Sequence, residues 1–96
     1  MKASSLSQTS IISADKNHLA TELNGETVIL SFATGSYFGL DEVGSVIWKA
    51  IQQPTSISQI CEAVMSEYDV PQEECYADIV DIIQELVAHQ LATVAS

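Results

Sequence analysis

The 96-residue chain carries 13 Asp and Glu residues against three Lys and no Arg, a net charge of −10, and 47% of its residues are hydrophobic. This length fits one domain with one core, and the hydrophobic content excludes a disordered chain. The charge argues against nucleic acid and against an anionic membrane as partners, because both are bound through Lys and Arg.

The N-terminal segment and the cysteines indicate a cytoplasmic protein. Residues 1–10 are rich in Ser, Thr and Gln, so we expect a flexible segment there and a single domain over residues 11–96. The segment lacks the apolar core of a signal peptide, and no apolar run approaches the roughly 20 residues that span a bilayer. Cys61 and Cys75 are too few for a disulfide scaffold, and we interpret them as reduced thiols.

A β-hairpin is predicted in the first half of the chain. Residues 27–32 are β-branched and aromatic, and alternation places three apolar side chains on one face. These side chains are Val28, Leu30 and Phe32. Asn24-Gly25 is a strong hairpin turn signal, which makes residues 18–23 the antiparallel partner. We expect the helices to cover the apolar face, because so small a sheet is not stable alone.

A third strand is predicted over residues 36–40, after a turn at Thr34-Gly35. As the last strand of the meander it would be an edge with unpaired backbone groups. Tyr37 and Phe38 make this edge aromatic, and it contains no Lys or Pro to block pairing. Such an edge can capture an extended peptide by strand addition, or it can be covered by the tail of the chain itself.

Three amphipathic helices are predicted after the strands. Asp41 is the N-cap of the first helix, Ser56 and Gln59 form a capping box for the second, and Pro71 can begin the third. In each helix apolar residues recur at helical spacing and indicate a packed face. Residues 91–94 close the chain as a short extension. The predicted fold class is α+β and winged-helix-like: a three-stranded antiparallel sheet followed by three helices.

The third predicted helix separates apolar residues from acidic ones. Its apolar arc contains Tyr76, Ile79, Val80, Ile83, Leu86 and Val87. Its acidic stripe contains Glu74, Asp78, Asp81 and Glu85. Cys75 and Ile82 lie on a border between the two. The stripe can be a solvated face, or its border can line a binding groove. Without a basic residue, this helix is excluded as a DNA-recognition helix.

Residue types and spacings give no support for catalysis. His18 and His89 lie far apart in sequence, no His or Cys spacing fits a metal site, and no glycine-rich phosphate loop is present. Cys61 and Cys75 occupy apolar or border positions, where a thiol acts as a small hydrophobe. We therefore predict no enzyme, no cofactor and no metal. An acyl or peptidyl carrier protein is an alternative, with Ser45 as the candidate for phosphopantetheine, although the strand-rich first half does not fit a four-helix carrier.

Three separated blocks match one pattern in the correct order. The first block spans residues 37–48 and begins Tyr-Phe-Gly-Leu-Asp-Glu-Val-Gly. The second lies within residues 55–70 and contains Thr-Ser-Ile at its start and Glu-Tyr-Asp-Val at its end. The third spans residues 78–86. This pattern resembles the PqqD-like proteins, also called RiPP recognition elements, and in particular the stand-alone leader-binding proteins of lasso-peptide biosynthesis. The resemblance covers roughly residues 18–92. Gln52-Gln53-Pro54 and Gln90-Leu91 depart from the glycine-containing turns that are usual there.

The resemblance implies a winged-helix-like adaptor for the leader of a ribosomally made precursor peptide. The leader would add to the third strand, in a cleft beside the third helix, and be presented to a transglutaminase-like cysteine leader peptidase, with a macrolactam-forming cyclase as a further partner. The implied peptide-binding residues are Ser36, Tyr37, Phe38, Gly39, Leu40, Glu74, Cys75, Asp78, Ile79 and Ile82. The opposite border of the third helix, with Tyr76, Val80 and Val87, is equally compatible. A winged-helix interaction module without a leader ligand is the remaining alternative.

Overall fold

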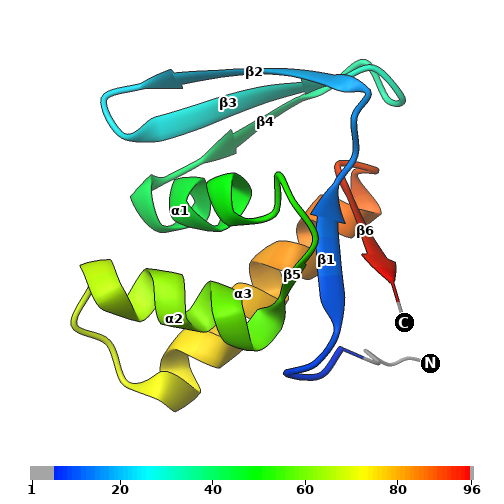
Figure 1. Ribbon diagram of the computed structural model, residues 1–96. Coiled ribbons are helices and arrows are strands. Elements are labelled where there is room, and N and C mark those ends of the chain that lie inside the picture. The colour runs from blue at the N-terminus through cyan, green and yellow to red at the C-terminus, as the bar shows by residue number, and fades with distance from the viewer. Residues whose placement is uncertain (1–5, 96) are drawn as a thin grey trace.

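The computed structural model describes residues 6–95, which form three helices and two three-stranded antiparallel sheets (Figure 1). In chain order the elements are β1 (Ile11–Ala14), β2 (His18–Leu23), β3 (Glu26–Ser31), β4 (Tyr37–Leu40), α1 (Glu42–Ala50), β5 (Thr55–Ser56), α2 (Ile57–Glu67), α3 (Gln72–Ala88) and β6 (Ala92–Ala95). One sheet has the order β2-β3-β4 and the other β5-β1-β6. The α+β class, the meander and the three helices are confirmed, and the second sheet is an addition to the prediction.

The turns of the meander contain residues that reach the left-handed conformation. Asn24 and Gly25 have φ values of 57° and 82°, the two positive values that a type I′ hairpin turn requires. Gly35 has a φ of 70°, and its N–H donates to the carbonyl of Ser31 at 2.8 Å. These two turns bring β2, β3 and β4 into consecutive antiparallel pairs.

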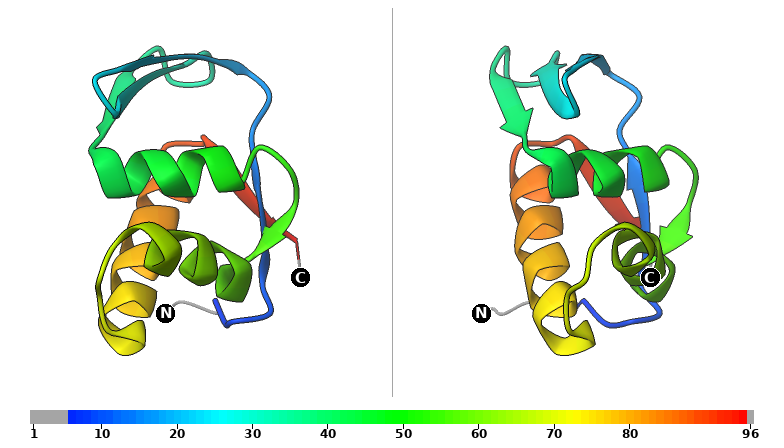
Figure 2. Two further views of the ribbon diagram at one scale, coloured as in Figure 1. Left: turned by 60° about the vertical axis from the view of Figure 1, so that its left-hand side comes forward. Right: turned by 90° about the vertical axis from the view of Figure 1, so that its left-hand side faces the viewer.

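Helix α1 covers one face of the β2-β3-β4 sheet (Figures 1 and 2). Ile29 of β3 is fully buried. The hydroxyl of Thr27 donates a hydrogen bond to the hydroxyl of Ser45 in α1 at 2.7 Å. Trp48, which lies off the apolar stripe of α1, packs edge-on against His18 of β2 with ring centroids 4.9 Å apart. One face of the sheet is therefore anchored to the helices.

The apolar sheet face that we expected to be covered is instead open. Val28 and Phe32 are exposed, Leu30 is half-buried, and no helix or strand within residues 6–95 lies over their side of the sheet (Figure 2). The residues buried on the other side are Thr27, Ile29 and Ser31. The grouping by alternation is confirmed, but the choice of buried face is wrong. Helix α1 can pack on the more polar face because Ser45 provides a hydrogen-bond partner for Thr27.

The second sheet joins segments from both ends of the described chain. β1 pairs antiparallel with β5 on one side and with β6 on the other, and β6 contains most of the predicted terminal extension. The core beside it is aliphatic. Its fully buried members are Ile12, Ile29, Ile47, Ile51, Ile57, Ile60, Ile79, Ile83, Leu86 and Leu91.

Helix α3 packs through a face that is rotated from the predicted arc. Pro71 is the N-cap, so the helix begins one residue later than expected. Its buried residues are Cys75, Ile79, Ile83 and Leu86. Tyr76 and Val80 are half-buried, and Val87 is 38% exposed. The core-facing side is therefore centred nearer Cys75, which belongs to the core and not to a border.

Part of the expected N-terminal flexible segment, residues 1–5, lies outside the described residues. Residues 7–10 form a turn that contacts the start of α2: Ser58 donates its N–H to the carbonyl of Gln8 at 3.0 Å, and Ile57 donates to that of Ser10 at 3.1 Å. The boundary at residue 10 stays a prediction.

Gln90 occupies a position that favours glycine. It follows His89, the C-cap of α3, with a φ of 61°, and Leu91 donates its N–H to the carbonyl of Leu86 at 2.8 Å in a Schellman-type ending. We expect Gln90→Gly to raise the free energy of unfolding by about 0.5–1 kcal/mol, because glycine adopts this conformation without steric cost. Urea unfolding measures the change. Gln84→Gly, within α3, should instead lower the same free energy by about 1 kcal/mol, and equal shifts would contradict this assignment.

Candidate functional site

Strand β4 is an edge strand with one free side. Within residues 6–95 it pairs only with β3. Ser31 donates its N–H to the carbonyl of Ser36 at 3.0 Å, so antiparallel alternation directs the backbone groups of residues 36, 38 and 40 to β3. The N–H and C=O groups of Tyr37 and Gly39 therefore point to the open side. This is the pattern of donors and acceptors that an added strand needs.

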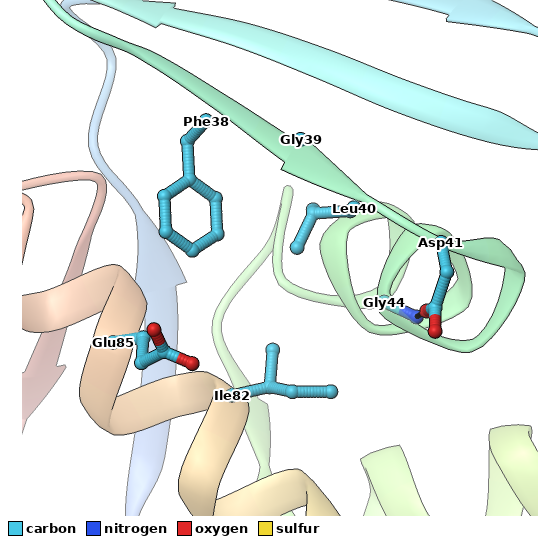
Figure 3. Close-up of a pocket in the computed structure, with 7 residues that line it drawn as sticks. All are labelled: Phe38, Gly39, Leu40, Asp41, Gly44, Ile82 and Glu85. Carbon is cyan, nitrogen blue, oxygen red and sulfur yellow. Dashed lines mark hydrogen bonds between the residues drawn. The ribbon is translucent and has the colours of Figure 1, made fainter.

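A cavity of about 270 Å³ opens between this edge and α3 (Figure 3). Its lining residues are Phe38, Gly39, Leu40, Asp41, Gly44, Ile82 and Glu85. Phe38 and Leu40 point from β4 toward the helix, and Ile82 and Glu85 approach from α3 (Figure 3). We call this the strand cavity. It lies on the inner side of the β4 edge, so alternate side chains of an added strand would point into it.

Local contacts shape the walls of the strand cavity. The Asp41 carboxylate accepts the N–H of Gly44 at 2.9 Å and caps α1, as the sequence predicts. A Cβ at Gly44 would lie 3.0 Å from two atoms of the Leu40 side chain, so glycine allows α1 to begin directly against β4. Phe38 contacts the ring of His89 at a centroid distance of 4.8 Å, which positions the Phe38 ring beside the end of α3.

The predicted peptide-binding residues fall into three groups. Those that line the strand cavity are Phe38, Gly39, Leu40 and Ile82. Those that line a second cavity of about 90 Å³, here called the corner cavity, are Cys75, Asp78 and Ile79. Ser36, Tyr37 and Glu74 line neither. Ser36 lies in the turn before β4, and Tyr37 is 74% exposed on the outer face of the sheet.

The two borders of α3 face different parts of the structure. Ile82 and Glu85 face β4, whereas Val87 lines a separate hollow with residues of β6. The border with Ile82 is thus the one that faces β4. Four neighbours of the site were not predicted from the sequence: Asp41, Gly44, Glu85 and His89. The capping signal of Asp41 located the start of α1, but it gave no indication of the cavity beside it.

The surroundings of the strand cavity are acidic. Glu85 is exposed at its wall, and Asp78 is exposed one helical turn before Ile82 on α3. Within residues 6–95, the one salt bridge joins Lys49 to Glu22 at 2.8 Å. No Lys of this part of the chain therefore neutralises Glu85 or Asp78. The local charge is therefore unfavourable for an acidic ligand.

The two cysteines are buried and protonated at neutral pH. Burial raises the pKa of Cys61 to about 11, and it also raises the pKa of Cys75. Because the thiolate is the nucleophile, neither thiol is activated for covalent catalysis.

Within residues 6–95, no three His, Cys, Asp or Glu side chains gather closely enough to hold a metal ion. None of the helices in this part of the chain is sufficiently long and apolar to cross a membrane.

Comparison with known proteins supports the resemblance noted from the sequence. The family model of coenzyme PQQ synthesis protein D (PqqD) matches residues 26–92. The chain belongs to the PqqD family. The matched range contains β4, α1 and α3, so every residue that lines the strand cavity of this PqqD-family protein lies inside it. No curated protein sequence matches the chain.

Two solved structures share the fold of this PqqD-family protein. TbiB1 in complex with the TbiA(beta) leader peptide is 30% identical, and the match covers 83% of this chain and 93% of that chain with a TM-score of 0.77. Lasso peptide synthetase B1 complexed with the leader peptide is 18% identical, with 85% and 96% covered and a TM-score of 0.73. The second likeness concerns the fold alone. Family and fold are thus as the sequence predicts.

Proposed function

We propose that this protein is a non-catalytic adaptor that binds the leader of a ribosomally made precursor peptide, in the cytoplasm, by adding it as a strand to β4. The observation that carries this proposal is the open backbone edge of Tyr37 and Gly39 directly beside the strand cavity. The same ligand class is supported by TbiB1, which is 30% identical and was solved with a leader peptide. The predicted residues of β4 and of the border of α3 are the proposed contacts.

The expected affinity for the leader can be estimated from strand hydrogen bonds, a buried apolar side chain and exposed ion pairs. Each strand hydrogen bond contributes about 0.5–1.5 kcal/mol net, and an apolar side chain buried in the strand cavity contributes about 1.5–3 kcal/mol. Exposed pairs with Glu85 or Asp78 add at most about 1 kcal/mol. After the cost of ordering the peptide, a dissociation constant between about micromolar and nanomolar is expected.

Amide hydrogen exchange tests strand addition directly. The probe is the TbiA(beta) leader, the peptide bound by TbiB1. Binding should slow exchange at Tyr37 and Gly39, whose N–H groups face the open side. The amides of Ala20 and Glu22 on β2, the other edge of the sheet, should be unchanged. Peptide binding that leaves the β4 amides unprotected would refute the proposal and favour an interaction module of another kind.

The carrier-protein alternative conflicts with the position of Ser45. This side chain is 2% exposed, and its hydroxyl accepts a hydrogen bond from Thr27 at 2.7 Å under the sheet. A phosphopantetheine arm attached there would have to displace α1 from β3. The geometry therefore favours peptide binding over acyl carriage.

We further propose that a leader peptidase docks on the open outer face of the β2-β3-β4 sheet. The exposed apolar residues of this face and its margin are Leu19, Leu23, Val28, Phe32 and Tyr37. Continuous apolar patches of this kind mark interaction sites. The cyclase stays a prediction as a further partner.

Leu19→Glu tests the outer face without touching β4. Leu19 is 62% exposed, so we expect the variant to fold and to bind the leader within about twofold of the parent affinity. Leader removal by the peptidase should slow about tenfold or more, because a charge replaces an apolar contact in the interface. Thr93→Glu adds the same charge on the exposed part of β6 and is the matched control. Equal processing rates for both variants would exclude this docking face.

A further inference from the structure

Strand β6 is a further free edge, and it belongs to the sheet that does not contain β4. Within the described residues it pairs only with β1, and Figure 1 shows it at the margin of the fold, on the opposite side of β1 from β5. The N–H of Asp15 donates to the carbonyl of Leu91 at 2.8 Å, so antiparallel alternation directs the backbone groups of Thr93 to β1. The N–H and C=O groups of Ala92 and Val94 therefore point to the open side.

A hollow of about 500 Å³ adjoins this edge. It is lined by Asp15, Val87, Gln90, Ala92, Thr93 and Val94. Val87 and Val94 are 38% and 39% exposed, so apolar surface borders open space here. Removal of this surface from water would favour a partner that occupies the hollow.

Strand β6 differs from the other free sheet edges in charge. β2 contains Glu22, and β4 lies beside Asp41 and Glu85. β5 has two residues and leads directly into α2. Residues 90–95 are uncharged. Because the chain has a net charge of −10, β6 is the edge at which a second copy can approach with the least local repulsion.

We propose that two copies of this protein associate by antiparallel pairing of their β6 strands about a twofold axis at Thr93. Ala92 of each copy then lies opposite Val94 of the other. Each such pair exchanges two N–H to C=O hydrogen bonds, because both residues direct their backbone groups outward. The inference goes beyond the proposed function, since β4 is in the other sheet and stays open in each copy.

The proposed axis keeps the acid nearest to β6 away from its equivalent. Asp15 lies opposite Leu91, one strand away from the proposed interface. Across the joined sheets the two Asp15 residues would be separated by three strand spacings, about 14 Å. This distance exceeds the Debye length of roughly 8 Å at physiological salt. The net charge of each copy still opposes association, so we expect added salt to strengthen it.

Sedimentation equilibrium measures the association. The mass of the parent protein should rise from that of one chain toward that of two as its concentration is raised to about 1 mM, since pairing of four-residue strands gives a small interface. Added salt should shift this rise to lower concentrations. A parent protein that stays monomeric throughout would overturn the inference.

Thr93→Glu and Thr93→Lys together test the axis. Thr93 is exposed, so we expect both variants to fold. At the axis the two copies of this residue have Cβ atoms about 4.5–5.5 Å apart, so either variant alone places like charges opposite each other. An equimolar mixture places opposite charges there and should associate about tenfold more tightly than either variant alone. A mixture that associates no more tightly than the separate variants would overturn the axis at Thr93.

Val94→Pro removes one outward N–H from β6 without removing a hydrogen bond to β1. Its mass should stay that of one chain over the concentrations at which the parent protein associates. Ala20→Pro is the matched control, because the Ala20 N–H faces the open side of β2, and it should associate like the parent protein. Equal association of the two proline variants contradicts pairing through β6.

Hydrogen exchange of the parent protein gives the same information if Val94→Pro does not fold. Raising the protein concentration should slow exchange at Ala92 and Val94, whereas the amide of Ala20 should be unchanged. Association without protection of the β6 amides would overturn the inference. Association that Leu19→Glu abolishes would place the interface on the outer face of the other sheet and would overturn it as well.

Discussion

Replacing Gly39 by proline should weaken leader binding about thirtyfold or more while the fold persists. The Gly39 N–H faces the open side of β4, so proline removes no hydrogen bond from the pair with β3. Proline is tolerated on edge strands in this orientation. Its ring would stand where the backbone of the peptide must approach. Loss of about two strand hydrogen bonds, at roughly 1 kcal/mol each, gives the expected change.

Gly39→Ala is the control for this variant. It keeps the N–H, and its Cβ would meet no atom within 4 Å, so the affinity should stay within about twofold of the parent value. Titration of a fluorescent leader peptide measures both variants, and circular dichroism confirms that both are folded. A folded proline variant that binds as tightly as the alanine variant would show that the leader does not pair with β4.

Ile82→Asp should weaken leader binding between about tenfold and a hundredfold. Ile82 is half-buried where α3 faces β4, and aspartate would replace an apolar wall of the strand cavity with a charge beside Glu85. The loss of one buried apolar anchor, at about 1.5–3 kcal/mol, sets this range. Ile79→Asp is unsuitable, because Ile79 is fully buried and its replacement would unfold the core.

Asp81→Ala is the matched control for Ile82→Asp. Asp81 is exposed, adjacent in sequence and absent from the strand cavity, so its replacement should leave the affinity within about twofold. Isothermal titration with the same leader, after thermal melts of both variants, decides the comparison. Equal affinities for the two variants would mean that the peptide does not enter the space between β4 and α3.

Local signals predicted most of the fold, and long-range pairing explains what they missed. The positive φ values at Asn24 and Gly25 and the capping box of Ser56 and Gln59 follow from residue type and spacing alone. The second sheet gives no such signal, because β5 has two residues and β1 pairs with β6 from the other end of the chain. Which face of the sheet stays open depends on the side against which α1 packs. The alternation of residues in β3 defines two faces but does not indicate which of them α1 covers.

In the candidate site too, some features could be predicted from the sequence and others could not. The β4 edge could be predicted because a meander places its last strand at the margin. Glu85 could not, since the helical periodicity of α3 assigned it to a solvated stripe, and only the packing of Cys75 in the core shows how the helix is rotated. His89 contacts Phe38 across the fold from a distant part of the sequence, and neither residue type indicates the other as a neighbour.

If a leader peptide adds to β4 as proposed, the pleat of this strand determines how the leader sequence can diverge. In a strand added at this edge, successive side chains would face opposite sides, one set toward the strand cavity and the other toward the outer face. Substitutions in the first set would change affinity for this protein, and those in the second would change only the surface that the processing enzyme meets. Selection for binding and selection for processing would thus act on alternate positions of one short segment. The residues at one set of positions could then change without affecting the function of the other set.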